Sequence, residues 1–342
     1  MLEKPPLEDR RIQAHLQKAY NLESLGVEFL PLGADVNTAV YRISAPEREA
    51  YFLKLRKANF NEISALVPDL LSQQGLRQVI PPLRAQDGSL WTSLESYTCI
   101  LYPFIEGRNG FGGTLEEAQW VEFGAALRSL HTTHLPEELR ARISVERFSP
   151  RWREQVRSLL AQVQEQGYAD SAAEKMAALM REQQELIRYL VERAGQLGSR
   201  LQSRPLDLVL CHSDIHAGNL LLAEDGSLYI VDWDDLIQAP KERDLMFAGG
   251  GVGGIWNSER EEALFYQGYG AVEIDLTALA YYRIERVIQD IAEFGKQLLL
   301  SAEGGDDREQ AYRFFSGQFS PGEVIAMAMR TDRKLRESGE GD

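Results

Sequence analysis

Short runs of apolar and β-branched residues, separated by turn residues, characterise the chain between residues 27 and 102. Runs of this kind that end at turn residues are typical of β-strands. Asp87-Gly88 is a hairpin-type turn, and Ala45-Pro46 interrupts the pattern. The pattern therefore predicts a small antiparallel sheet with strands at residues 27–32, 39–43, 50–55, 90–94 and 97–102.

One helix interrupts this predicted sheet. Its apolar positions recur with the spacing of a single helical face: Ile63, Leu66, Val67, Leu70 and Leu71. Pro68 lies inside the stripe. Because proline lacks an N–H and its ring clashes with the preceding turn, we expect it to kink or split the helix.

Helical periodicity dominates from residue 114 onward. Thr114 with Glu117 forms a capping-box pattern before a helix. Residues 151–202 are amphipathic without a sustained heptad, which favours bundle helices over a coiled-coil surface. A second small β-unit is predicted at residues 208–210, 220–222 and 228–231, and the remainder is expected to be helical. The fold class is therefore α+β, with a small N-terminal lobe (1–104) and a larger, mainly helical C-terminal lobe (105–342) that contains the helical segment 114–202.

Composition narrows the classes of partner. The 342 residues are 44% hydrophobic, and 37 basic against 52 acidic residues give a net charge of −15, a balance that repels nucleic acid and anionic membranes. Cys99 and Cys211 are too few for a disulfide framework. The sequence has no signal-peptide pattern and no apolar run long enough for a membrane helix. We expect a soluble, cytoplasmic monomer or weak homodimer whose partner is a small cationic molecule.

The strongest chemical signal is the stretch from His212 to Asn219, followed by a predicted hairpin and Asp232. It fits H-x-D-x-x-x-x-N, the spacing of a kinase catalytic loop followed by a metal-binding aspartate. In this interpretation Asp214 accepts the proton of a substrate hydroxyl, while Asn219 and Asp232 supply oxygen ligands to Mg²⁺. Each residue taken alone is equally a turn or strand-end residue, but their combination favours phosphoryl transfer.

A second element of the same pattern lies upstream. Lys54 stands among apolar residues of a predicted strand, and Glu62 begins the helix that follows. In kinases such a lysine holds the α- and β-phosphates and pairs with the helix glutamate. A lysine on an edge strand and a glutamate on a solvated helix face are the alternative interpretations.

These residues resemble the aminoglycoside phosphotransferase family, which has a two-lobed, protein-kinase-like fold. The similarity covers almost the whole chain, and the stretch from Ala239 to Gly253 resembles the spectinomycin-like branch. The resemblance implies ATP and Mg²⁺ as cofactors and nucleotide bound between the lobes. It also implies two structural roles: Asp244 braces the catalytic-loop backbone, and His212 hydrogen-bonds the backbone.

The nucleotide-binding residues follow from the same comparison with kinases. Gly33, Asn37 and Thr38 are predicted to cover the phosphates, although the stretch lacks a full glycine-rich loop. The end of the last small-lobe strand predicts the adenine site, with the Tyr102 carbonyl and the Phe104 amide as its hydrogen-bonding pair.

The acceptor is predicted to be a small hydroxylated cation such as an aminocyclitol, because the chain is strongly acidic. Two groups of residues are candidates for its binding. The acidic ones are Asp234, Asp235, Glu285 and Asp290, and the aromatic or polar ones are Asn109, Phe111, Trp256, Asn257, Tyr282 and Arg283.

Three other functions remain open at this point. A kinase of choline, methylthioribose or an amino alcohol would carry the same catalytic residues. A nucleotide-binding scaffold without transfer activity is disfavoured because lysine, base and metal ligands are all present. A zinc hydrolase built on His212 and His216 lacks an evident third ligand.

Overall fold

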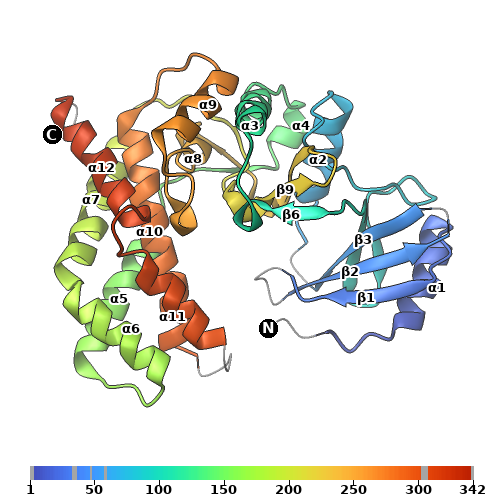
Figure 1. The fold of residues 1–342 in the computed structure, drawn as a ribbon, viewed down its shortest axis with the longest axis horizontal. Helices are drawn as coiled ribbons and strands as arrows, with labels where there is room; N and C mark the ends of the chain where they lie inside the picture. Colours follow the sequence, from blue (N-terminus) through green and yellow to red (C-terminus); the bar gives the residue numbers. More distant parts are fainter. Residues whose placement is uncertain (1–3, 33–36, 47, 58–59, 302–306, 340–342) are drawn as a thin grey trace. The chain divides into compact units, whose positions relative to one another are not determined.

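The computed structural model describes residues 4–32, 37–46, 48–57, 60–301 and 307–339 (Figure 1). The chain forms two compact units. Unit 1 comprises Met1–Gly113, Thr133–Ile143 and Gly218–Leu236, and unit 2 comprises Thr114–Thr132, Ser144–Ala217 and Ile237–Asp342. Across the described ranges, no helix is both long enough and apolar enough to cross a membrane.

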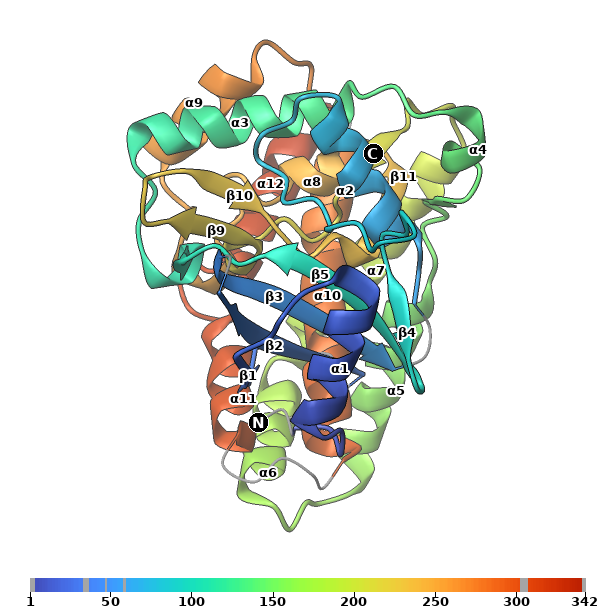
Figure 2. The ribbon, with the colours of Figure 1, turned by 90° about the vertical axis from the view of Figure 1, so that its right-hand side faces the viewer.

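Unit 1 is built on a five-stranded antiparallel sheet in the order β1-β2-β3-β5-β4. Its strands are β1 Gly26–Leu30, β2 Thr38–Ala45, β3 Arg48–Lys57, β4 Thr92–Leu94 and β5 Tyr97–Pro103. Helix α1 (Asp9–Tyr20) packs on one face of this sheet (Figure 2). Ile12 and Leu16 of α1 are fully buried against Tyr41, Leu53 and Leu55. All five predicted strands are present, and alternation of apolar residues along them sets which face is buried.

Two further elements complete unit 1. Helix α2 (Ile63–Gln73) runs through Pro68 without a break, so the predicted split is wrong. Burial of Ile63, Val67, Pro68 and Leu71 stabilises the helix despite the missing N–H. A three-stranded sheet has the order β10-β9-β6, with β6 Gly107–Asn109, β9 Leu220–Ala223 and β10 Leu228–Ile230. Short helix α4 (Glu137–Arg140) also lies in unit 1.

Unit 2 is mainly helical and centres on the long helix α10 (Leu276–Leu299). The helices that pack against α10 are α5 Arg151–Glu165, α6 Ser171–Glu182, α7 Gln184–Gln202, α8 Glu242–Leu245, α11 Asp307–Gly317 and α12 Val324–Glu337. Figure 1 shows α7, α10 and α12 side by side. The region 151–202 therefore forms bundle helices, as predicted. The α+β class is confirmed as well.

Two details of unit 2 differ from the predictions. Helix α3 (Glu117–His131) is capped by Glu116, whose N–H donates to Gln119 Oε1 at 2.9 Å, rather than by Thr114 with Glu117. A three-stranded sheet joins β7 Ser144–Val145, β11 Ile237–Ala239 and β8 Val209–Cys211. Strand β11 falls in a stretch that the sequence predicted to be helical. The strand was missed because three residues are too few to show the alternation of apolar and polar side chains.

Helix α3 packs closely against α9 (Glu259–Tyr269) through two glycines. A Cβ on Gly124 would meet the carbonyl of Phe265, and a Cβ on Gly268 would meet the carbonyl of Val121. Backbone atoms cannot move aside as a flexible side chain can. Gly268→Ala is therefore expected to lower the free energy of unfolding by about 1–3 kcal/mol, measured by denaturant unfolding. Gly317→Ala, where a Cβ meets no atom within 4 Å, is the matched control and should not lower it.

Candidate active site

Lys54 forms the centre of a charged cluster in unit 1. Strand β3 places Lys54 and Arg56 on the same face, because side chains two residues apart point to one side of a strand. Lys54 Nζ lies 2.7 Å from Asp234 Oδ2 and 3.2 Å from Asp232 Oδ1, and Arg56 also pairs with Asp234. The Lys54 side chain is 14% exposed. Burial alone would lower the pKa of Lys54, but Asp232 and Asp234 more than offset it and raise the pKa above its ordinary value. Lys54 is therefore a cation at neutral pH.

Glu62 does not pair with Lys54, so this part of the kinase pattern is corrected. Its side chain is 46% exposed at the start of α2 and pairs with Arg142 of the same unit. Lys54 instead donates to Asp232 and Asp234, which follow β10. Sequence spacing identified Lys54 but missed Arg56, although its alternation with Lys54 was a usable signal.

Asn219 directly precedes β9 and Asp232 follows β10, so both lie at the open end of the β9–β10 hairpin in unit 1. The carbonyl of Asn219 accepts the N–H of Val231 at 2.9 Å, which ties the two ends together. Asp232 has a left-handed backbone (φ 62°), and the indole N–H of Trp233 donates to the Ile230 carbonyl at 3.0 Å and anchors the turn. The Asp232 side chain is 52% exposed. An amide oxygen and an accessible carboxylate are hard oxygen donors, so the pair fits Mg²⁺.

Asp214 belongs to unit 2, where its loop follows β8 and is held by Asp244 of α8. The carboxylate of Asp244 accepts the N–H of His212 at 2.8 Å and that of Ser213 at 2.6 Å. Ser213 takes a left-handed conformation (φ 72°), which costs free energy for a residue other than glycine. The ring Nδ1 of buried His212 accepts the N–H of Asp214 at 3.4 Å. Both interactions fix the loop backbone next to the predicted base.

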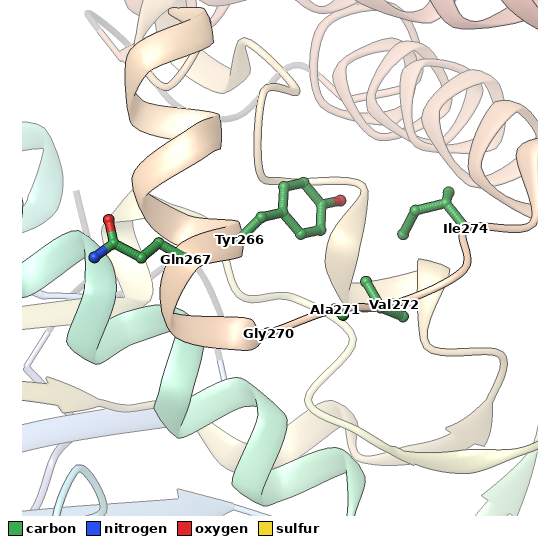
Figure 3. Close-up of a pocket in the computed structure, with 6 residues that line it drawn as sticks. All are labelled: Tyr266, Gln267, Gly270, Ala271, Val272 and Ile274. Carbon is green, nitrogen blue, oxygen red and sulfur yellow. The ribbon is translucent and has the colours of Figure 1, made fainter.

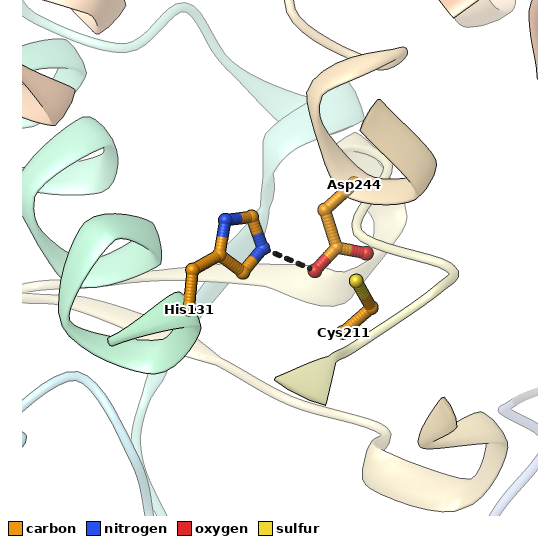
Figure 4. Close-up of side chains that lie close together, drawn as sticks. All are labelled: His131, Cys211 and Asp244. Atoms are coloured by element: carbon orange, nitrogen blue, oxygen red, sulfur yellow. Dashed lines mark hydrogen bonds and ion pairs between the residues drawn. The ribbon is translucent and has the colours of Figure 1, made fainter. Parts of the chain in front are cut away.

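Asp244 also belongs to a buried hydrogen-bonded group, of which Figure 4 shows His131 and Asp244 together with Cys211. His131 Nε2 lies 3.0 Å from Asp244 Oδ2, and His131 Nδ1 lies 2.7 Å from the Tyr269 hydroxyl. Cys211 completes a group of three metal-type donors with His131 and Asp244. The Asp244 carboxylate already accepts hydrogen bonds from His131, His212 and Ser213, so the three side chains His131, Cys211 and Asp244 have a structural role. No sequence signal had singled out His131.

The zinc-hydrolase alternative gains no support from this geometry. His212 Nδ1 is engaged with the Asp214 N–H, and His216 Nε2 lies 3.4 Å from Asp214 Oδ2. Within the residues that the structure describes, the group of potential metal ligands is His131, Cys211 and Asp244, which includes neither His212 nor His216. Burial raises the pKa of the Cys211 thiol well above its ordinary value, which disfavours the thiolate that zinc requires.

The Asp214 side chain is held by a cation that the sequence did not reveal. Arg286 of α10 donates through Nη1 to Asp214 Oδ1 at 2.5 Å. Burial would raise the pKa of Asp214, but His216 and Arg286 outweigh it and hold the pKa well below its ordinary value. Asp214 is therefore ionised at neutral pH, the state that uptake of a hydroxyl proton requires.

The predicted adenine contacts require a correction. The Phe104 N–H donates to the Ala50 carbonyl at 3.3 Å, so it continues the pairing of β5 with β3. Alternate residues of a strand direct their N–H and C=O groups to the same side, so the Tyr102 carbonyl also faces β3. The Leu101 carbonyl points the other way and accepts from Leu83. The groups that follow Leu101 on that edge are the Pro103 carbonyl and the Ile105 N–H.

The predicted phosphate-covering residues are described only in part. Gly33 lies outside the described residues. The carbonyl of Asn37 accepts the N–H of Lys57 at 2.8 Å, and Thr38 begins β2 opposite Arg56. Both are placed by the β2–β3 pairing near the end of the strand that carries Lys54.

Burial excludes two predicted acceptor contacts. Trp256 is 3% exposed and packs edge-on against Trp120 of α3, and Tyr282 is 0% exposed against Phe148 and Tyr281. Both are core residues of unit 2, because large aromatic rings gain most by complete burial. Arg283 is likewise committed to the carbonyls of Met246 and Ala248.

The other residues predicted to bind the acceptor molecule are either exposed at the surface or engaged in contacts within the protein. Asn109 Oδ1 caps a short turn by accepting the N–H groups of Phe111 and Gly112, while Phe111 is 47% exposed. Asp235 is exposed, and Asp234 is committed to Lys54 and Arg56. Asn257 donates to the carbonyls of Gly254 and Gly322.

A pocket of about 540 Å³ lies at the C-terminal end of α9 in unit 2 (Figure 3). Its lining residues are Tyr266, Gln267, Gly270, Ala271, Val272 and Ile274. The lining is mostly apolar and includes no predicted catalytic or metal-binding residue. The pocket is therefore separate from the chemistry described above.

Glu285 of α10 is a buried carboxyl that pairs with the buried side chain of Arg153. Burial raises its pKa to about 7, although Arg153 Nε, 3.2 Å away, acts in the opposite direction. Because the folded-state pKa lies above the unfolded value, the folded protein loses stability as pH rises from about 4.5 to 7. Glu285→Gln should therefore be more stable than wild type by about 2–3 kcal/mol at pH 8, with the gain vanishing toward pH 4. Denaturant unfolding across this range tests it, with exposed Glu192→Gln as the control.

Comparison with known proteins places these features in a family. Residues 28–282 match the model of the phosphotransferase enzyme family, APH. The chain is similar to spectinomycin phosphotransferase APH(9)-Ia in complex with ADP and spectinomycin, with 35% identity, a TM-score of 0.90, and coverage of 96% of this chain and 99% of that chain. The AMP-bound complex of the same enzyme matches with 35% identity, a TM-score of 0.86, and coverage of 95% and 99%.

More distant structures share the fold. A choline/ethanolamine kinase family protein from Mesorhizobium loti matches with 17% identity, a TM-score of 0.56, and coverage of 94% of this chain and 99% of that chain. With its catalytic-loop spacing, its five-stranded sheet and its helical second unit, the chain belongs to the APH phosphotransferase family and has the protein-kinase-like fold of that family.

Proposed function

We propose that this enzyme transfers the γ-phosphoryl group of ATP to a hydroxyl of spectinomycin, a cationic aminocyclitol. The observation that carries the proposal is the match over nearly the whole chain, at 35% identity, to an enzyme whose complex contains ADP and spectinomycin. The net charge of −15 supports a cationic acceptor. Phosphorylation of spectinomycin would confer resistance to this antibiotic.

In the proposed reaction the acceptor oxygen attacks the γ-phosphorus, and the bond to the oxygen shared with the β-phosphate breaks to release ADP. Asp214 accepts the hydrogen bond of the hydroxyl and takes up its proton. Lys54 balances negative charge on the phosphates. Asn219 and Asp232 would hold Mg²⁺, which when bound neutralises phosphate charge.

The adenine base is proposed to bind the edge of β5 through the Pro103 carbonyl and the Ile105 N–H. Ile105→Pro removes that N–H and leaves the adenine acceptor without its hydrogen bond. The KM for ATP is therefore expected to rise about tenfold, which corresponds to the loss of one hydrogen bond. Steady-state kinetics at saturating acceptor measure it. Ile105→Ala keeps the N–H and should leave this KM within about twofold; an equal rise in both variants would contradict the assignment.

The acceptor is tested by release of ADP in the presence of spectinomycin, other aminoglycosides, choline, methylthioribose and aminopropanol. The expected result is a kcat/KM for spectinomycin at least about tenfold above that of any other compound. A preference for choline or an amino alcohol would replace the proposal by the metabolic-kinase alternative, since the fold is shared with such kinases. Expression in a susceptible bacterium should raise the inhibitory concentration of spectinomycin.

A further inference from the structure

Helix α10 brings two charged side chains to the catalytic loop within unit 2. Arg286 Nη1 lies 2.5 Å from Asp214 Oδ1, and Arg286 Nε lies 2.9 Å from Asp290 Oδ1, one helical turn further along α10. The side chains of Arg286 and Asp290 are only 17% and 15% exposed. One guanidinium thus joins two carboxylates in a partly buried environment.

The position of this guanidinium is fixed on a third side by an aromatic ring. The Arg286 Cζ lies 5.8 Å from the ring centroid of Phe247, within the range of a cation–π interaction. His216 also packs edge-on against Phe247, with ring centroids 6.3 Å apart. Arg286 therefore has far less freedom to rotate than a surface arginine.

The two carboxylates that pair with Arg286 differ in the direction of their pKa shifts. Burial raises the pKa of Asp290 to about 6, with Arg286 lowering it and Glu293 raising it further. The pKa of Asp214 is instead held below its ordinary value by His216 and Arg286. Arg286 Nη1 thus donates to Asp214, the carboxylate that must stay ionised, while Asp290 pairs with the guanidinium through Nε.

The geometry leaves the second oxygen of Asp214 in a defined place. Oδ1 accepts from Arg286, and Oδ2 lies on the side of His216, 3.4 Å from its Nε2. Rotation about the last bond of an aspartate is broad and weakly restrained, so the plane of an unsupported carboxylate is not fixed. A general base must be held close to its productive geometry to be effective.

We propose that Arg286, braced by Asp290, is a positioning residue for phosphoryl transfer that fixes the plane of the Asp214 carboxylate and so presents Oδ2 to the acceptor hydroxyl. The inference rests on the phosphotransferase function proposed above. The sequence had given Asp290 only as an acid near the acceptor and had not selected Arg286.

The first test compares Arg286→Gln, Arg286→Lys and Asp290→Asn in steady-state kinetics. Arg286→Gln is expected to lower kcat about 10–100-fold with the KM for ATP nearly unchanged, and Asp290→Asn about 3–10-fold. Arg286→Lys keeps the charge without the forked geometry and should recover only part of the loss. Exposed Arg188→Gln is the control. An Arg286→Gln enzyme with kcat within twofold of wild type would overturn the proposal.

The second test asks whether Arg286 acts through Asp214. In an Asp214→Asn background, Arg286→Gln should lower kcat by less than about twofold, because the group it positions is already inactive. Full additivity of the two losses would overturn the proposal and indicate a general structural role. The acid limb of kcat/KM should also move to higher pH in Arg286→Gln, with Asp290, Glu293 and His216 as the other titrating neighbours.

A third measurement does not depend on the identity of the acceptor. In a crystal structure of Arg286→Gln, the Asp214 carboxylate is expected to leave its present plane while the loop backbone stays on Asp244. A carboxylate that keeps the same plane would overturn the positioning role. If wild type instead transfers phosphate to a compound other than spectinomycin, the kinetic tests are run with that compound, and only the choice of acceptor fails.

Discussion

Asp214→Asn is expected to lower kcat for phosphoryl transfer about 10²–10⁴-fold, the range attributed to a general base. Asparagine has the same shape but no negative charge, so it cannot take up the hydroxyl proton. The KM for ATP should stay within about threefold, since the proposed phosphate contacts belong to other residues. Coupled measurement of ADP release over a range of ATP concentrations separates the two constants.

Asp225→Asn is the matched control for this substitution. Asp225 lies in the β9–β10 turn, where its Oδ1 accepts the N–H of Ser227 at 2.9 Å, an interaction that asparagine can keep. The Asp225→Asn enzyme should have the kcat of wild type. An Asp214→Asn enzyme that retains more than a tenth of wild-type kcat would refute the assignment of the base.

Lys54→Met is expected to lower kcat/KM for ATP about 10²–10³-fold, the usual loss when one preorganised charge-stabilising group is removed. Its physical basis is the cluster in which Lys54 is a partly buried cation that pairs with Asp232 and Asp234. Without Lys54, Asp234 keeps Arg56 as its partner, so the fold should survive. Nucleotide titration by calorimetry and thermal unfolding measure binding and folding separately.

Arg56→Met is the comparison for Lys54. Arg56 shares Asp234 with Lys54 but has no assigned phosphate contact, so its loss should reduce kcat/KM for ATP by about tenfold or less. Equal losses in the two variants would show that the cluster as a whole, rather than the Lys54 ammonium, supports nucleotide binding. A fully active Lys54→Met enzyme would contradict the proposed function itself.

The candidate residues of the proposed catalytic loop could be selected from the sequence because the predicted chemistry depends on spacing along one continuous segment. Asp214, Asn219 and Asp232 follow a fixed pattern, and the strands around Lys54 follow from alternation. Arg286 and His131 could not be found in this way. They reach Asp214 and Asp244 from distant helices, and nothing in the helical pattern of α10 or α3 separates them from ordinary polar positions.

The errors have equally specific causes. Trp256 and Tyr282 were selected for their chemistry, but large rings are also the side chains that gain most from burial in a core. Phe104 was chosen for its N–H without regard to the direction that β-pairing imposes on it. Glu62 was paired with Lys54 by analogy, whereas Arg142 was available to it through a contact distant in sequence.

The chain segments that make up each unit limit where this polypeptide can be cut into folded fragments. Unit 1 draws on three separate stretches of chain, and its β6–β9 pairing and the Val79–Ile230 bridge join residues more than a hundred positions apart. A fragment that ends near residue 113 would thus lack the hairpin carrying Asn219 and Asp232. During synthesis on the ribosome, nearly half of unit 2 is translated before the hairpin that carries Asn219 and Asp232 can join unit 1.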